Sequence, residues 1–172
     1  MDANKVRTHL ETATNVVVLA VVTIIIAIFA WGFFAQNSSP NIQKGLQKGT
    51  VFAALPPHDF GAARRTIVLA MNSSCGYCNE SIAFYRQVVE AANKNNVQVI
   101  AISQEKEISF KKYLSQSQLN IDARPQVDLN SYGIAATPTA ILIDENGLIL
   151  DFWVGKLSQE SEKQVIKALM ND

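Results

Sequence analysis

Cysteine and histidine are scarce in this chain, and charges of the two signs are in balance. The 172 residues contain two cysteines, Cys75 and Cys78, so no second pair is available for a separate structural disulfide. The two histidines are His9 and His58, too few to add the two ligands that a zinc site on a Cys-X-X-Cys pair needs. Fifteen basic side chains offset fifteen acidic ones, so net charge does not favour a nucleic-acid partner. We therefore expect no metal, no nucleic acid, and a fold that depends on its core.

One long segment contains no charged residue. Val16 to Phe34 comprises nineteen residues, which as a helix would span roughly 28 Å, close to the hydrocarbon thickness of a bilayer. A cleaved signal peptide is the alternative, but its apolar core has about 7–15 residues and ends at a small-X-small site. Here the run is longer, and Phe33 lies where a small residue is needed for cleavage after Ala35. The sequence predicts a retained transmembrane helix over residues 16–34.

The basic residues around this segment predict its orientation. Lys5 and Arg7 precede it, and the next basic residue after it is Lys44. The positive-inside rule then places residues 1–15 in the cytoplasm. Residues 35–50 are rich in Asn, Ser, Gln, Lys and Gly and are interpreted as a linker. The remaining domain, residues 51–172, is expected outside the cytoplasm, on the periplasmic side, tethered to the membrane.

Hydrophobic periodicity in residues 51–172 alternates between strand and helix. Two short apolar runs are each followed by a helical pattern. This strand–helix–strand–helix order predicts parallel strands joined by right-handed crossovers. A hairpin is then predicted around Asn146-Gly147, the strongest short hairpin signal, and a C-terminal helix begins after Ser158. The predicted strands are 66–71, 97–103, 139–144 and 148–154; the predicted helices are 81–92, 108–119 and the C-terminal helix after Ser158, whose apolar stripe is Val165, Ile166, Leu169 and Met170. We expect an α/β domain with a mixed sheet and helices on both faces.

The two cysteines lie where the first predicted strand gives way to a helix. A thiolate at a helix N-terminus is stabilised by backbone N–H groups, which lowers its pKa. We therefore assign Cys75 as the exposed nucleophile and Cys78, one turn further on, as the thiol that resolves a mixed disulfide. Tyr77, between them, is expected to be exposed and to contact substrate. The redox centre would be the Cys75–Cys78 disulfide itself, with no other cofactor.

Four motifs together resemble the thioredoxin superfamily, over about residues 50–172. They are Cys75-Gly-Tyr-Cys78, Ala136-Thr-Pro-Thr139, Ile143-Asp-Glu-Asn-Gly147 and Trp153-Val-Gly-Lys-Leu-Ser158. Within the superfamily the chain is most similar to the membrane-tethered TlpA/ResA-like redoxins. The resemblance implies a thioredoxin-like fold in which Thr137 and the cis-proline Pro138 lie against the cysteines and pair with substrate. Gly155 would leave room for a bound peptide.

The implied function is thiol–disulfide exchange with protein substrates; the motif leaves the direction open, and the resemblance favours reduction over oxidation, with electrons supplied by another membrane protein. Two alternatives stay open. One is a peroxiredoxin-like thiol peroxidase with Cys75 as the peroxidatic residue, although Asn72 replaces the usual Thr three residues earlier. The other is a peptide-binding module without turnover. The chain also departs from the superfamily at Leu69, where thioredoxin has a buried Asp, and at Ser81, where a ResA-like acid is missing.

Overall fold

The computed structural model describes three stretches of the chain, residues 22–25, 45–56 and 59–170. Residues 22–25 are helical, and the other two stretches belong to an α/β domain. No helix among these described stretches combines the length and the hydropathy that crossing a bilayer requires. Apart from residues 22–25, the predicted transmembrane segment 16–34 lies outside the described residues, as do the predicted cytoplasmic segment 1–15 and most of the linker.

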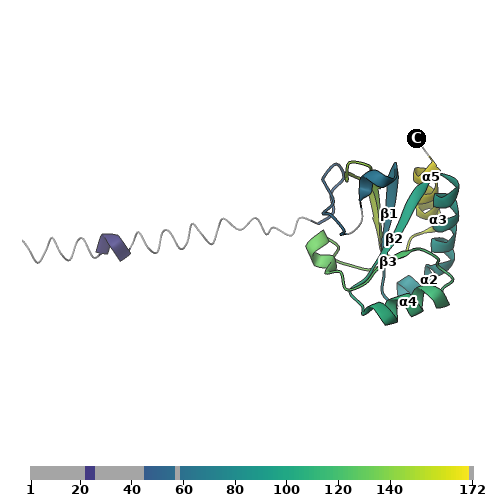
Figure 1. Ribbon diagram of the computed structural model, residues 1–172, viewed down its shortest axis with the longest axis horizontal. Helices are drawn as coiled ribbons and strands as arrows, with labels where there is room; N and C mark the ends of the chain where they lie inside the picture. The colour runs from purple at the N-terminus through teal and green to yellow at the C-terminus, as the bar shows by residue number, and fades with distance from the viewer. Residues whose placement is uncertain (1–21, 26–44, 57–58, 171–172) are drawn as a thin grey trace, which may run out of the picture. The chain divides into compact units, whose positions relative to one another are not determined.

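The domain is a five-stranded mixed sheet with α-helices packed on it (Figure 1). The strand order is β3-β2-β1-β4-β5; β1, β2 and β3 are parallel, and β4 and β5 run antiparallel to their neighbours. The strands are β1 (Arg65–Ala70), β2 (Val97–Ile102), β3 (Asp122–Arg124), β4 (Thr139–Asp144) and β5 (Ile149–Val154). The helices are α2 (Gly76–Glu80), α3 (Ile82–Lys94), α4 (Glu107–Gln116) and α5 (Gln159–Met170), with 3-10 helices η1 (Phe60–Ala62) and η2 (Leu129–Tyr132).

Successive side chains of each central strand point to opposite faces and join two separate hydrophobic clusters. In β1, Ile67 and Leu69 belong to the first cluster and Val68 and Ala70 to the second. The first cluster contains the buried side chains of α2, α3, α4 and α5. The second contains Phe52 and Leu55 from the N-terminal segment, together with residues of η1 and η2.

The expectation of helices on both faces therefore needs correction among the described residues. The α-helices share one face, and the opposite face is covered by 3-10 helices and loops. The cause is topological. The chain moves in one direction across the sheet from β1 through β2 to β3, and two right-handed crossovers in the same direction place their helices on the same side.

The predicted strands and helices are present, with differences at their ends. Strand β4 covers the predicted range, residues 139–144, whereas β3 was not predicted because it has three residues, two of them charged. The helical segment after the cysteines is divided at Ser81, which has φ −93° and ψ 2°. The Ser81 hydroxyl donates to the Tyr77 carbonyl at 2.8 Å, and such a side-chain bond to the preceding turn is a known cause of helix bending.

The segment that precedes η1 is attached to the β4–β5 hairpin. Gly49 N–H donates to the Ile149 carbonyl, Ile149 N–H donates to the Thr50 carbonyl, and Phe52 N–H donates to the Gly147 carbonyl, each at 2.8–2.9 Å. The ring of Phe52 packs at the same time against Phe60 and Tyr132 in the second cluster. The chain is thus bound to the sheet from about residue 48 onward.

Candidate active site

A short polar loop connects the end of β1 to the first cysteine. Asn72 organises it locally: its side-chain oxygen accepts from the backbone N–H of Ser74 at 2.9 Å and from the Ser74 hydroxyl at 2.7 Å. Its carbonyl accepts from Cys75 N–H at 3.1 Å. Cys75 is the N-cap residue of α2, so its position follows from the strand-to-helix transition that the sequence predicted.

The Cys75 thiol is partly exposed and has two polar contacts. Its sulfur accepts a hydrogen bond from the backbone N–H of Cys78 at 3.2 Å, and its thiol donates to the Thr137 carbonyl at 3.3 Å. Burial acts to raise the pKa of Cys75, but hydrogen bonds from the side chains of Cys78 and Thr137 and from the backbone N–H of Cys78 outweigh it, and the pKa lies below the ordinary thiol value of 9.0. Because α2 has five residues, these local N–H groups, rather than a long helix dipole, stabilise the thiolate.

Cys78 lies beneath Cys75, and its pKa is shifted in the opposite direction. Both cysteines are free thiols, but Cys78 is fully buried. Burial, and then its hydrogen bond with Cys75, raise the pKa of Cys78 to about 12. Two buried tyrosines belong to the same cluster, Tyr85 from α3 and Tyr113 from α4. Burial also raises the pKa of Tyr113 to about 12, so its phenol is protonated at neutral pH.

The loop before β4 contacts the cysteines from the other side. The Thr137–Pro138 peptide is cis, as predicted. Gly155 N–H donates to the Pro138 carbonyl at 2.7 Å, which joins the β5–α5 loop to this turn. A Cβ at Gly155 would meet no atom within 4 Å, but the residue has φ +82°, which L-amino acids with a side chain rarely adopt. Backbone conformation, more than space, accounts for glycine here.

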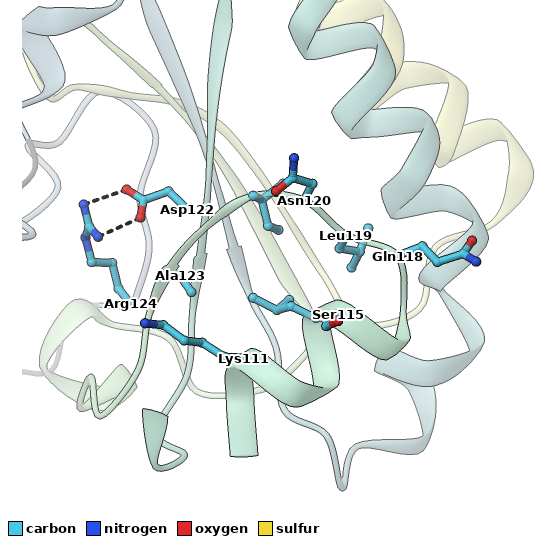
Figure 2. A pocket seen from close by; sticks show the side chains of 10 residues that line it. Lys111, Ser115, Gln118, Leu119, Asn120, Asp122, Ala123 and Arg124 are labelled. Atoms are coloured by element: carbon cyan, nitrogen blue, oxygen red, sulfur yellow. Dashed lines mark hydrogen bonds and ion pairs between the residues drawn. The ribbon is translucent and has the colours of Figure 1, made fainter. Parts of the chain in front are cut away.

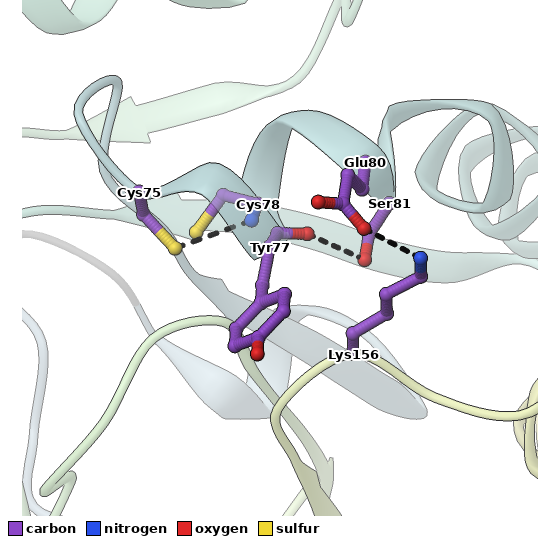
Figure 3. A network of polar contacts seen from close by, with 6 residues as sticks. All are labelled: Cys75, Tyr77, Cys78, Glu80, Ser81 and Lys156. Atoms are coloured by element: carbon purple, nitrogen blue, oxygen red, sulfur yellow. Dashed lines mark hydrogen bonds and ion pairs between the residues drawn. The ribbon is translucent and has the colours of Figure 1, made fainter.

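Exposed side chains of α2 and the β5–α5 loop lie to one side of the redox pair (Figure 3). Tyr77 is 61% exposed, as the sequence predicted. Glu80 forms an ion pair with Lys156 at 2.5 Å, which links the end of α2 to the loop that contains Gly155. The residues predicted as a site thus meet in one place, although they come from three separate segments of the chain: Cys75, Tyr77, Cys78, Thr137, Pro138 and Gly155.

Glu105 is not among the residues that the sequence predicted for this site. Its carboxylate accepts from the Ser73 backbone N–H at 2.9 Å and from the Ser73 hydroxyl, two residues before Cys75. The Ser103 hydroxyl is a third donor, at 3.4 Å. The signal was available, because Ser73 and Glu105 follow neighbouring parallel strands, whose carboxyl ends lie at the same edge of a sheet.

A separate hollow of about 620 Å³ lies between the C-terminal half of α4 and β3, and neither cysteine lines it (Figure 2). Its polar side chains include Lys111 and the ion pair of Arg124 with Asp122 at 2.6 Å. Within the part of the chain that the structure describes, no group of three or more His, Cys, Asp or Glu is close enough to hold a metal ion.

Comparison with known proteins gives three consistent results. The model of the AhpC/TSA family matches residues 46–152, more than half of the chain. Among curated relatives, the thiol-disulfide oxidoreductase ResA of Geobacillus thermodenitrificans is 27% identical over 100 residues, which are 55% of this chain and 57% of that protein. ResA of Bacillus anthracis is 22% identical over 99 residues, with the same coverage. The chain thus matches little more than half the length of these relatives.

Solved structures give the fold. The thioredoxin domain of a thiol-disulfide oxidoreductase from Bacteroides vulgatus matches with a TM-score of 0.61 and 18% identity, over 74% of this chain and 100% of that one. A thiol:disulfide interchange protein from Bacteroides sp. matches with a TM-score of 0.56 and 18% identity, over 73% and 92% of the two chains. The domain has a thioredoxin-like α/β fold, as the sequence motifs predicted.

Proposed function

Because this chain belongs to the AhpC/TSA family, we propose that its domain is a thiol–disulfide oxidoreductase that exchanges disulfides with protein substrates through Cys75 and Cys78. One observation carries the proposal: a partly exposed thiol with a lowered pKa lies directly over a buried thiol with a raised one. This asymmetry assigns a separate step to each cysteine. The ResA name of the curated relatives supports the same activity.

The reductase direction begins with attack on the substrate. The Cys75 thiolate attacks one sulfur of a substrate disulfide, forms a mixed disulfide and releases the other substrate sulfur as a thiolate. Cys78 then loses its proton and attacks the Cys75 sulfur, which forms the Cys75–Cys78 disulfide and releases the second substrate thiolate. The Cys78 proton and one from solvent convert the two thiolates to thiols. Two electrons pass from the protein to the substrate.

Thr137 and Gly155 are proposed to guide the substrate. The Thr137 carbonyl accepts from the Cys75 thiol at 3.3 Å, so the backbone of this turn lies beside the reacting sulfur. An extended substrate segment beside Cys75 can add its backbone to this turn, as in other peptide complexes that pair main chains. The exposed Tyr77 ring lies beside the two cysteines, where it can contact substrate side chains.

The trapping variant Cys78→Ser tests the exchange chemistry. Attack by Cys75 still occurs and resolution does not, so mixed disulfides with substrate proteins should accumulate on a non-reducing gel. Cys75→Ser is the matched control and should trap nothing, because Cys78 is buried. If Cys78→Ser traps no protein and the wild type rapidly consumes hydrogen peroxide, the chain is a thiol peroxidase. If Cys75→Ser still performs the protein's role in the cell, the chain is a peptide-binding module without turnover.

The reductase direction rests on the resemblance to tethered TlpA-like redoxins, and the reduction potential tests it. Potentials in this fold run from about −270 mV for a reductant to about −120 mV for a strong oxidant. We expect a value nearer the reducing end when the wild type is equilibrated with glutathione or dithiothreitol buffers. A potential near the oxidising limit would contradict the reductase direction and indicate that the protein oxidises its substrates.

We also propose that residues 16–34 anchor the domain outside the cytoplasm, where a membrane protein reduces it. The support is the uncharged run itself, with Lys5 and Arg7 before it. Protease added to intact spheroplasts should remove the domain and leave a small membrane-bound fragment. Protection of the whole domain until the cells are lysed would place the cysteines in the cytoplasm and overturn this topology.

A further inference from the structure

A polar groove opens beside the redox site, on the other side from the Thr137–Pro138 turn. It has a volume of about 600 Å³ and is formed by the loop before Cys75, α2, α3 and α4; its polar lining includes Ser73, Asn79, Arg86, Ser109, Lys112 and Tyr113. The sheet order explains its location. Helix α4 follows β2, and Pro138 precedes β4, and the two strands flank β1, whose end leads to Cys75.

Two cations supply the charge of this groove. Among the described residues that line it, Arg86 from α3 and Lys112 from α4 are the charged ones. Neither forms an ion pair within the described part of the chain. Arg86 uses its Nε to donate to the Ser117 carbonyl at 3.0 Å, which fixes the guanidinium and leaves its remaining donors for another group.

A buried phenol adds an unsatisfied donor. Tyr113 is 8% exposed and lines the groove, and within the described residues its buried hydroxyl meets no hydrogen-bond partner. Burying such a group without a partner is unfavourable, so an acceptor that reaches this hydroxyl would gain a hydrogen bond. Glu105, whose carboxylate accepts from Ser73 and Ser103, does not line the groove.

We propose that this groove binds an acidic segment of the protein substrate, close in sequence to its reactive cysteine. Carboxylates complement Arg86 and Lys112 and accept from hydroxyl donors. The groove reaches the redox site through Ser73, two residues before Cys75, and through Asn79, the residue after Cys78. A substrate whose cysteine bonds to Cys75 would therefore place residues three or four positions away, about 10–14 Å along an extended chain, in the groove.

This proposal rests on the proposed function, since the groove selects among substrates of the exchange reaction. It divides recognition into two parts. The Thr137 turn would pair with the substrate backbone, and this pairing does not depend on the substrate's sequence. The groove would select substrates that have acidic side chains near the reactive cysteine. Because exposed charge pairs are screened by salt, the selectivity should be strongest at low ionic strength.

Synthetic peptides with one internal disulfide provide the test. Three otherwise identical peptides would have Glu, Gln or Lys at the positions three and four residues from each cysteine, and the reduced full-length protein would be mixed with each. The rate constant for the Glu peptide should exceed that for the Gln peptide roughly three- to tenfold, and the Lys peptide should react most slowly. The difference should shrink at 0.5 M salt.

Substitutions locate the effect. The double variant R86Q/K112Q should reduce the Glu and Gln peptides at the same rate, and Lys112→Glu should favour the Lys peptide. Lys111→Gln is the matched control: Lys111 is the preceding residue on α4, pairs with Glu107 at 2.6 Å and lines the other hollow. Equal rates for the Glu and Gln peptides, or an equal loss in Lys111→Gln, would overturn the proposal.

A binding measurement separates this proposal from the function on which it rests. A cysteine-free Glu peptide should bind the wild type, observed by calorimetry or by chemical-shift changes at Arg86 and Tyr113, and should bind R86Q/K112Q more weakly. Absence of binding would overturn the groove proposal even if disulfide exchange proceeds. Binding without exchange of any peptide would support the groove and contradict the oxidoreductase function.

Discussion

Two thiols three positions apart have pKa values that are shifted in opposite directions. Cys75 accepts from the backbone N–H of Cys78, and its pKa is lowered, whereas the burial of Cys78 raises its pKa to about 12. The order of the two residues in the sequence predicted this assignment. The contact of Cys75 with Thr137 at 3.3 Å comes from tertiary structure, because sixty-two positions separate the two residues.

Alkylation should reveal the asymmetry. In the reduced protein, limiting iodoacetamide should label Cys75 much faster than Cys78 at every pH from 6 to about 10, because only a thiolate reacts. The rate at Cys75 should rise with pH through a midpoint below 9.0, and labelling of Cys78 should require pH near 12. Peptide mass mapping measures both rates. Equal rates, or faster labelling of Cys78, would contradict the assigned roles.

Glu105 provides a second prediction for a single residue. Glu105→Ala removes the acceptor of two hydrogen bonds from Ser73, and bonds to a charged group contribute about 1.5–3 kcal/mol each at most. We expect the free energy of unfolding to fall by roughly 1–3 kcal/mol and the Cys75 alkylation profile to change, because the loop before Cys75 loses its attachment to β2.

Glu107→Ala is the control for Glu105→Ala. Glu107 is two positions away and forms an exposed i,i+4 pair with Lys111, a type worth about 0.3–0.5 kcal/mol. Urea unfolding of the reduced proteins measures both variants. Equal losses in the two variants would show that Glu105 acts as a general surface charge and not through Ser73.

At the scale of elements, turns and breaks were harder to predict than strands. Periodicity predicted β4 to the residue and α3 over 81–92, but it gave no range for α2 as a separate helix, because the side-chain bond of Ser81 to the Tyr77 carbonyl has no signature in hydrophobic spacing. The Asn146-Gly147 signal was correct. Gly147 has φ +80°, and Asp144 N–H and the Leu148 carbonyl close the hairpin at 3.0 Å.

Gly147→Ala should therefore destabilise the domain. A Cβ here would lie 3.7 Å from the Phe60 ring, which is ordinary contact, so backbone strain at positive φ decides the effect. An alanine in the left-handed region costs about 1–2 kcal/mol. Gly45→Ala, where φ is not positive and no atom lies within 4 Å, should change stability by less than about 0.5 kcal/mol. Thermal unfolding compares them, and equal melting temperatures would exclude strain at Gly147.

At the scale of the whole molecule, one buried arginine joins the beginning of the domain to its end. Arg65, the first residue of β1, donates to the Ala168 carbonyl at 2.8 Å and the Leu169 carbonyl at 3.4 Å, in the last turn of α5. These carbonyls have no partner within the helix. The guanidinium therefore caps α5 across more than one hundred positions of sequence, while α3 and α5 pack beside each other on the same face.

Arg65→Met should weaken this connection. The variant keeps apolar volume but removes both donors, and we expect a loss of about 1–2 kcal/mol, because the buried Arg65 Nε lacks a partner among the described residues and its removal offsets part of the cost. Lys167→Met, in the same helical turn but exposed, should change stability by less than about 0.5 kcal/mol. Hydrogen exchange at α5 would locate the effect; unchanged protection there would contradict it.

The sequence by itself determined the redox pair, the succession of the longer strands and helices, and the residues of the Thr137–Pro138 turn, because these depend on local patterns of two to fifteen residues; the three-residue β3 gave no such pattern. Tertiary structure decided which faces the helices cover, since that follows from the direction of successive crossovers and not from helix periodicity. It also brought Glu105 to Ser73 and placed Arg86 and Lys112 on one groove. Glu105 and Ser73 follow neighbouring parallel strands, so strand pairing brings them together. Arg86 and Lys112 lie on different helices, and the packing of α3 and α4 on the sheet places both on the groove.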